Sequence, residues 1–178
     1  SDLRGLVAHE IDVHVCRGEA GARQPLRLFR IGLARADTTE EGLAILAEEQ
    51  VGSLSARFPW RQRLLHKAVV LAKSAGFREV FESVEKEAGS DVAWALSLRI
   101  KRGLQYPQKP GVYAKDVIYL KGWLQVRAYF QQGGSLENLY TGKVGLQHPV
   151  QDWLQAGWIQ KMPVPSLWKP TVLPSHPE

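Results

Sequence analysis

Helical spacing of apolar residues recurs along most of this 178-residue chain, and it constrains the fold more than any other feature of the sequence. In the first such segment, residues 2–17, leucine, isoleucine and valine recur mostly at intervals of three to four. Short breaks with glycine, proline or polar residues separate the later segments of this kind. We predict that these later segments are helices over residues 40–54, 59–75, 77–88, 92–104, 114–132, 136–140 and 150–157. The expected fold is therefore mainly α.

Two segments depart from the helical pattern. Residues 26–31 are compatible with a short strand or an extended connection, which leaves an α+β fold possible. Residues 163–178 contain several prolines and are expected to be extended. We therefore predict one catalytic or binding domain over residues 1–162, which is long enough for a substantial core, followed by an extended tail.

The first predicted helix carries two histidines around a carboxylate: His9 and Glu10 are followed by His14. Side chains four residues apart lie about 40° from each other around an α-helix, whereas five residues place them about 140° apart. Both imidazoles reach one metal ion only if a π-type turn restores their alignment. The spacing is one residue longer than the two-histidine zincin motif, so we predict a zincin-like metal-binding helix with a π distortion.

A glutamate in the next predicted helix supplies a third ligand for such a site. Glu41 follows His14 by 27 residues and stands next to Glu40, in the run Thr-Thr-Glu-Glu-Gly-Leu-Ala. Catalytic zinc commonly has three protein ligands, two histidines and a glutamate being one established set, and keeps a fourth position for water. We therefore predict His9, His14 and Glu41 as zinc ligands, with Glu40 as the alternative to Glu41.

Each part of this site also has a purely structural interpretation. His9 and His14 could be a half-buried and a solvated helix histidine. Thr38 and Glu41 have the spacing of a capping box, in which the glutamate only accepts from a backbone N–H at the helix start. Gly42 favours the metal site, because glycine costs about 1 kcal/mol relative to alanine inside a helix and needs a reason such as close backbone approach.

The sequence resembles the QEGLA-motif family, which includes the microtubule-associated tyrosine carboxypeptidases. The likeness rests on the His-Glu-x-x-x-His pattern and on the Glu-Gly-Leu-Ala run, where Glu40 stands in place of the motif glutamine. It extends over nearly the whole chain, through Gln24-Pro25-Leu26, Gly32-Leu33-Ala34, Arg102-Gly103, residues 115–120, Gly122 and Gly142-Lys143-Val144. Family members are longer at the N-terminus, so we expect the parent protein to have further sequence before the active-site helix.

The resemblance implies a zinc metallopeptidase of the carboxypeptidase type, with His9, His14 and Glu41 at the positions of the ligands and Glu10 at that of the catalytic base. Water activated by zinc would lose its proton to Glu10, which would pass it to the departing amine. For Asp12 we expect a supporting or a solvated position. The expected reaction removes a C-terminal residue from an acidic protein tail, tubulin-like if the source is eukaryotic.

Substrate-binding residues are expected in a strongly basic segment. Residues 99–127 contain seven lysines and arginines against one acidic residue, Asp116. Arg102 or Lys115 could bind the free terminal carboxylate of a substrate through a charge-assisted hydrogen bond, or each could be part of a solvated helix face. Tyr119 or Tyr113 could donate its hydroxyl to the developing oxyanion, and each could equally be a packing residue.

Composition narrows the remaining classes of protein. The net charge of +5 favours acidic partners, and the single cysteine, Cys16, fits a reducing compartment such as the cytoplasm. No apolar run reaches the roughly 20 residues of a membrane span, so we expect no membrane partner. We also expect no nucleic acid, because no nucleic-acid motif accompanies the basic and aromatic residues. The main alternative to a peptidase is a non-catalytic metal-binding domain with a regulatory or interaction role.

Overall fold

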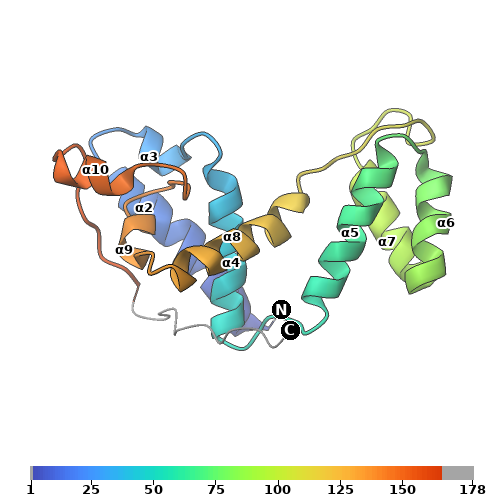
Figure 1. The fold of residues 1–178 in the computed structure, drawn as a ribbon, viewed down its shortest axis with the longest axis horizontal. Helices are drawn as coiled ribbons and strands as arrows, with labels where there is room; N and C mark the ends of the chain where they lie inside the picture. Colours follow the sequence, from blue (N-terminus) through green and yellow to red (C-terminus); the bar gives the residue numbers. More distant parts are fainter. Residues whose placement is uncertain (1, 166–178) are drawn as a thin grey trace. The chain divides into compact units, whose positions relative to one another are not determined.

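The computed structural model describes residues 2–165, and every regular element in that range is a helix (Figure 1). In chain order the elements are α1 (Leu3–Leu6), the π-helix η1 (Val7–Val15), α2 (Cys16–Ala22), α3 (Leu28–Ile31), α4 (Ala36–Gln50), α5 (Phe58–Ala72), α6 (Phe77–Ala88), α7 (Ser90–Lys101), α8 (Val117–Gln131), α9 (Leu136–Leu139) and α10 (Val150–Gln155). The mainly α prediction is confirmed. Within residues 2–165, no helix is long and apolar enough to cross a membrane.

The chain divides into two compact units. One contains Ser1–Ser55 and Lys121–Glu178, and the other contains Ala56–Leu120, so that the second of the two boundaries between them in the sequence falls within α8. The domain predicted over residues 1–162 includes helices of both units. Of the predicted tail, residues 163–165 have no regular structure, and the remainder lies outside the described residues.

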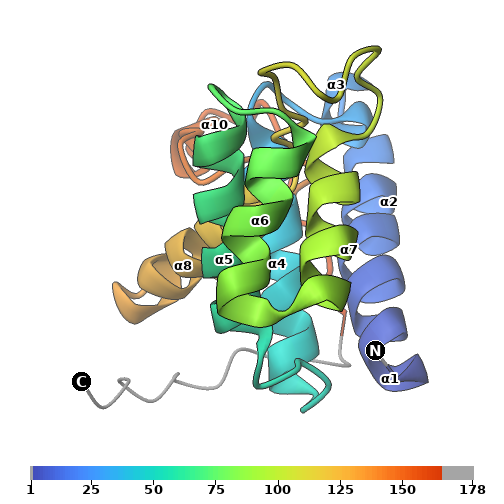
Figure 2. The same ribbon diagram turned by 90° about the vertical axis from the view of Figure 1, so that its right-hand side faces the viewer.

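In the second unit, α5, α6 and α7 lie side by side (Figure 2). Their shared core consists of Leu64, Leu65, Ala68, Val69, Ala72, Val80, Val84, Ala93, Leu96 and Ile100. At the end of α7, the buried ammonium group of Lys101 donates hydrogen bonds to three backbone carbonyls, at 2.6, 3.0 and 2.8 Å. These carbonyls belong to Ala75, Lys109 and Gly111, so this one side chain ties the loop after α7 to the end of the α5–α6 connection.

In the first unit, α4 is buried along most of its length and carries the centre of the core. Residues 42–47 are all buried, which is typical of a helix covered by neighbours rather than of an amphipathic surface helix. η1 packs along α4. α8 contacts α4 where two glycines meet: a Cβ added to Gly42 would lie 2.1 Å from the carbonyl carbon of Gly122, and one added to Gly122 would lie 2.0 Å from the carbonyl oxygen of Thr38. The close backbone approach considered for Gly42 is therefore present.

Residues 28–31 form α3, so the strand or extended connection proposed for residues 26–31 is wrong. A half-buried strand would alternate, but only Phe29 is buried while Leu28 and Ile31 are exposed. The backbone of Lys143, from much later in the chain, bonds to both sides of this turn. The N–H of Lys143 donates to the carbonyl of Phe29 at 2.8 Å, and the carbonyl of Lys143 accepts from the N–H of Leu33 at 3.0 Å.

The start of α4 also differs from the prediction. The helix begins at Ala36, four residues before the expected start, because Arg35 takes the left-handed backbone conformation (φ 64°) and ends the preceding turn there. Thr38 therefore lies inside the helix rather than at its cap. The capping box with Glu41 does not form, and Glu41 lies in the second turn with its side chain available for another role.

The glycine contact between α4 and α8 leads to a test of stability. In Gly122→Ala the new methyl group would overlap backbone atoms of α4, so we expect the free energy of unfolding in urea to fall by about 1–3 kcal/mol. Gly18→Ala is the matched control, because a Cβ at this helical glycine meets only the end of the Lys143 side chain at 3.5 Å. It should be neutral or stabilising by up to about 1 kcal/mol. Equal stability of the two variants would contradict the packing described for α4.

Candidate metal centre

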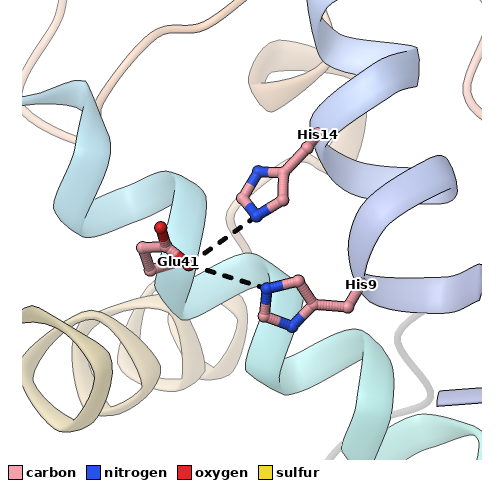
Figure 3. A group of neighbouring side chains, drawn as sticks. All are labelled: His9, His14 and Glu41. Atoms are coloured by element: carbon pink, nitrogen blue, oxygen red, sulfur yellow. Dashed lines mark ion pairs between the residues drawn. The ribbon is translucent and has the colours of Figure 1, made fainter. Parts of the chain in front are cut away.

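The π-helix η1 places both histidines of the first helix on the face that meets α4. The predicted π-type turn is confirmed, and the structure extends it over nine residues, Val7–Val15. The rings of His9 and His14 have centroids 5.0 Å apart in spite of the five-residue spacing. Both rings point across to Glu41 on α4 (Figure 3).

Three ligand atoms converge between the two helices. Oε2 of Glu41 lies 3.7 Å from Nε2 of His9 and 3.6 Å from Nε2 of His14, and all three atoms lie within 4.8 Å of one another. Two ligands of one tetrahedral zinc ion, each about 2.0–2.1 Å from it, are separated by about 3.4 Å. The donor set and these two distances therefore fit zinc, and the side chains are only 16–20% exposed.

The other nitrogen of each imidazole faces a second carboxylate. Nδ1 of His9 lies 2.6 Å from Oε1 of Glu48, and Nδ1 of His14 lies 2.9 Å from Oε1 of Glu40. Because an ionised carboxylate only accepts, Nδ1 carries the proton in both rings, and a neutral ring then turns a bare Nε2 toward Glu41. Carboxylate–histidine pairs of this kind orient the histidine ligands of protein metal sites.

Glu40 is held from further directions by two cations. Its Oε2 accepts from Arg17 at 2.7 Å, and its Oε1 lies 2.9 Å from the ammonium group of Lys143. Of the two adjacent glutamates that the sequence left as alternatives, Glu41 is the one whose carboxylate faces both imidazoles. Glu40 instead meets the outer nitrogen of His14.

The paired charges shift the pKa values of the site. Burial by itself would lower the pKa of His9, but the carboxylates of Glu41 and Glu48 outweigh it and raise this pKa to about 9. Burial would raise the pKa of Glu41, and the two imidazoles instead lower it to about 2. Burial would likewise lower the pKa of His14, but Glu40 and Glu41 raise it. His9, His14 and Glu41 are termed the triad. In the metal-free chain the two imidazoles of the triad therefore hold protons at the place where a cation would bind.

The predicted base, Glu10, is exposed and follows His9 in η1. Among residues 2–165 its carboxylate forms no hydrogen bond or ion pair, so it is available to a water molecule or a substrate. Asp12 is buried rather than solvated, and burial raises the pKa of its carboxyl group. Its side chain contacts neither imidazole through a hydrogen bond.

The three predicted substrate-binding residues, Arg102, Lys115 and Tyr119, belong to the second unit. Arg102 bonds Asp116 at 3.2 Å, and its guanidinium lies over the ring of Tyr113, 4.2 Å from the centroid. Arg99 also donates to Asp116. The single acidic residue of the basic segment thus neutralises part of its charge. The roles of Arg102, Lys115 and Tyr119 toward a substrate stay predictions.

Several residues that support the triad were not identified from the sequence. Glu48 follows Glu41 by seven residues, two helical turns, and therefore lies on the same face of α4. Arg17 follows His14 by three residues, a spacing that also places two helical side chains on one face. These spacings are signals that a search around the predicted ligands could have used. Lys143 and Tyr140 carry no such local signal, because they come from a distant part of the chain.

Comparison with known proteins places this chain in a family. A family model described as microtubule-associated tyrosine carboxypeptidase matches residues 1–171. The human microtubule-associated tyrosine carboxypeptidase 1 is 37% identical over 134 residues, which cover 72% of this chain and 28% of the human protein. The rat protein of the same name is 33% identical over 172 residues, 94% of this chain and 36% of the relative.

The chain belongs to the microtubule-associated tyrosine carboxypeptidase family. The resemblance found in the sequence is thereby confirmed. The matched range, residues 1–171, spans the positions of the triad and of Glu40 and Glu48. The chain spans only about a third of the length of these relatives, 28% of the human and 36% of the rat protein.

The pKa shifts predict how the metal-free chain responds to pH. The pKa of His9 is raised from 6.5 to about 9, so its contacts stabilise the fold fully below pH 6.5, and this contribution is lost as the pH rises through 9. The pKa of Glu41 is lowered from 4.5 to about 2, so its contribution is present above pH 4.5 and is lost as the pH falls through 2. We expect the free energy of unfolding, measured in urea with chelator present, to fall between pH 6.5 and 9.

His9→Gln is the control for this pH dependence, because glutamine does not titrate in the range. Its unfolding free energy should fall less steeply between pH 6.5 and 9 than that of the wild-type chain. The same slope in both proteins would contradict the assignment of the effect to His9.

Proposed function

We propose that this chain forms the metal centre of a zinc-dependent carboxypeptidase that removes the C-terminal residue of a protein substrate. The observation that carries the proposal is the convergence of His9, His14 and Glu41 from two packed helices, with Glu40 and Glu48 behind the imidazoles. Membership of a family named for tyrosine carboxypeptidases supports the reaction class.

His9, His14 and Glu41 would hold the zinc ion. Bound there, zinc would supply a Lewis acid for the scissile carbonyl and would lower the pKa of water. Glu40 and Glu48 accept from the Nδ1 protons and so keep both Nε2 lone pairs directed at the site. Because of this arrangement, the imidazoles would not have to reorient when zinc binds.

Glu10 would act as general base and then as general acid. Its carboxylate would accept a proton from the attacking water and return it to the departing amine as the peptide bond breaks. Support for this role comes from its place next to His9 and from its exposed carboxylate, which has no hydrogen bond or ion pair within the described part of the chain.

The substrate would be a protein with an acidic C-terminal tail. The relatives are named microtubule-associated tyrosine carboxypeptidases, so we propose a C-terminal tyrosine as the leaving residue and, in a eukaryote, a tubulin-like tail in the cytoplasm. The net charge of +5 favours such a substrate.

Zinc content tests the metal centre. We expect about one zinc ion per wild-type chain by elemental analysis, since one set of three ligands is present in residues 2–165. His14→Ala and Glu41→Ala should both lose the metal. His66→Ala is the control, because this histidine only contacts a backbone carbonyl within α5. Retention of zinc by His14→Ala or Glu41→Ala would exclude that residue as a ligand.

Glu10→Gln tests the chemistry. This variant should keep its zinc and lose cleavage of peptides with an acidic C-terminal tail ending in tyrosine by about 10²–10⁴-fold, because the amide cannot accept the proton. Glu19→Gln, an exposed glutamate on the following helix, should cleave at the wild-type rate. Peptides with an amidated C-terminus should resist cleavage.

The zinc and cleavage measurements together separate a peptidase from a non-catalytic metal-binding domain. Unchanged turnover in Glu10→Gln would exclude it as the base. A wild-type chain that binds zinc but cleaves none of these peptides would contradict the peptidase proposal and favour a non-catalytic metal-binding domain.

A further inference from the structure

A short segment far along the chain reaches the metal centre through a buried arginine. Arg17 is fully buried in α2, and its guanidinium donates to the backbone carbonyls of Leu139 at 2.8 Å and Val144 at 2.5 Å. Its third nitrogen, Nη1, donates to Glu40, the carboxylate that meets Nδ1 of His14. The residues between these two carbonyls, 139–144, are termed the clasp segment.

The same segment also contacts the π-helix directly. Tyr140 is fully buried and donates its hydroxyl to the backbone carbonyl of Asp12 at 2.7 Å. Asp12 lies in η1, and the N–H of Cys16 bonds the carbonyls of Ile11 and Val13 rather than the Asp12 carbonyl with which it would pair in an α-helix. The hydroxyl of Tyr140 thus reaches a carbonyl that the π-type bonding releases from the α-helical pattern.

These contacts join the clasp segment to both histidines. Arg17 acts through Glu40 on the orientation of His14, and Tyr140 acts on the backbone that separates His14 from His9. Uncommon backbone conformations persist where the surrounding structure holds them in place. The buried hydroxyl of Tyr140 holds a carbonyl of the nine-residue π-helix in this way, and Arg17 holds the start of α2, which directly follows it.

We propose that Arg17 and Tyr140 are positioning residues for metal binding, which fix the clasp segment against α2 and η1 and so keep both imidazoles directed at one cation. The inference rests on the proposed zinc centre. A positioning role of these two residues differs from a purely structural role in one measurable respect. A structural role lowers the stability of the metal-free fold, whereas a positioning role weakens zinc binding by chains that are still folded.

Tyr140→Phe is the decisive variant, because it removes one hydroxyl and keeps the ring in the core. In the 178-residue chain we expect its zinc affinity, measured by competition with a chelator, to be about 10–100-fold weaker than that of the wild type, as is typical when an outer contact of a metal site is lost. Far-ultraviolet circular dichroism and thermal unfolding of the metal-free chains establish that both are folded at the temperature of measurement.

Tyr129→Phe is the matched control. Its hydroxyl also donates to a backbone carbonyl of the same unit, that of Ser135 at 2.9 Å, but this bond does not involve η1. We expect wild-type zinc affinity. Equal weakening in Tyr129→Phe and Tyr140→Phe would overturn the inference, because the loss would then follow from general destabilisation.

A second pair of variants tests the arginine. Arg17→Met should weaken zinc binding, whereas Arg127→Met should not, although Arg127 is also a buried arginine with a carboxylate partner, Glu49 at 2.6 Å. Should Arg17→Met fail to fold, Tyr140→Phe decides alone. Zinc affinity of Tyr140→Phe within about twofold of the wild type overturns the inference and leaves the zinc centre intact. Failure of the wild-type chain to bind zinc overturns both.

Discussion

Two imidazoles five residues apart must share one face of a helix to bind one cation, and the other features of the proposed metal centre depend on how the chain meets this condition. η1 brings the rings of His9 and His14 to 5.0 Å, so that one glutamate on α4 reaches both. α4 can present that glutamate because it is packed against η1 and, through Gly42, against the backbone of α8. The proposed ligands therefore project from elements that the apolar core already holds.

Charge around the centre is nearly balanced before any metal is considered. Glu40, Glu41 and Glu48 supply three carboxylates, and Arg17 and Lys143 supply two cations close to Glu40. With the imidazoles neutral, as metal binding requires, one negative charge remains, which a divalent cation would convert into one positive charge. A centre of that sign would attract a free terminal carboxylate, whereas the three carboxylates without the two basic side chains would leave it negative and repel such a substrate.

The sequence predicted the parts of this centre that depend on local spacing. The five-residue separation of the histidines required a π-type turn, which is present, and the position before Gly42 favoured Glu41, whose carboxylate lies opposite both imidazoles. Helix periodicity likewise predicted most elements, but the strand suggested for residues 26–31 and the start of α4 were wrong. The first depends on a contact made elsewhere, because Lys143 completes the bonding of α3. The second depends on the left-handed conformation of Arg35, which no residue pattern marks.

The π-helix also affects how motifs for such a site can be found. A π turn accommodates about one more residue than an α turn, so it takes up an inserted residue without rotating the helix that precedes it. In an α-helix the same insertion would turn Gly5 and Ala8, which are buried in the first unit, by about 100° out of their contacts. Insertion between metal-binding histidines can thus leave a site intact in space while it changes the written motif, and a search restricted to the four-residue spacing would pass over it.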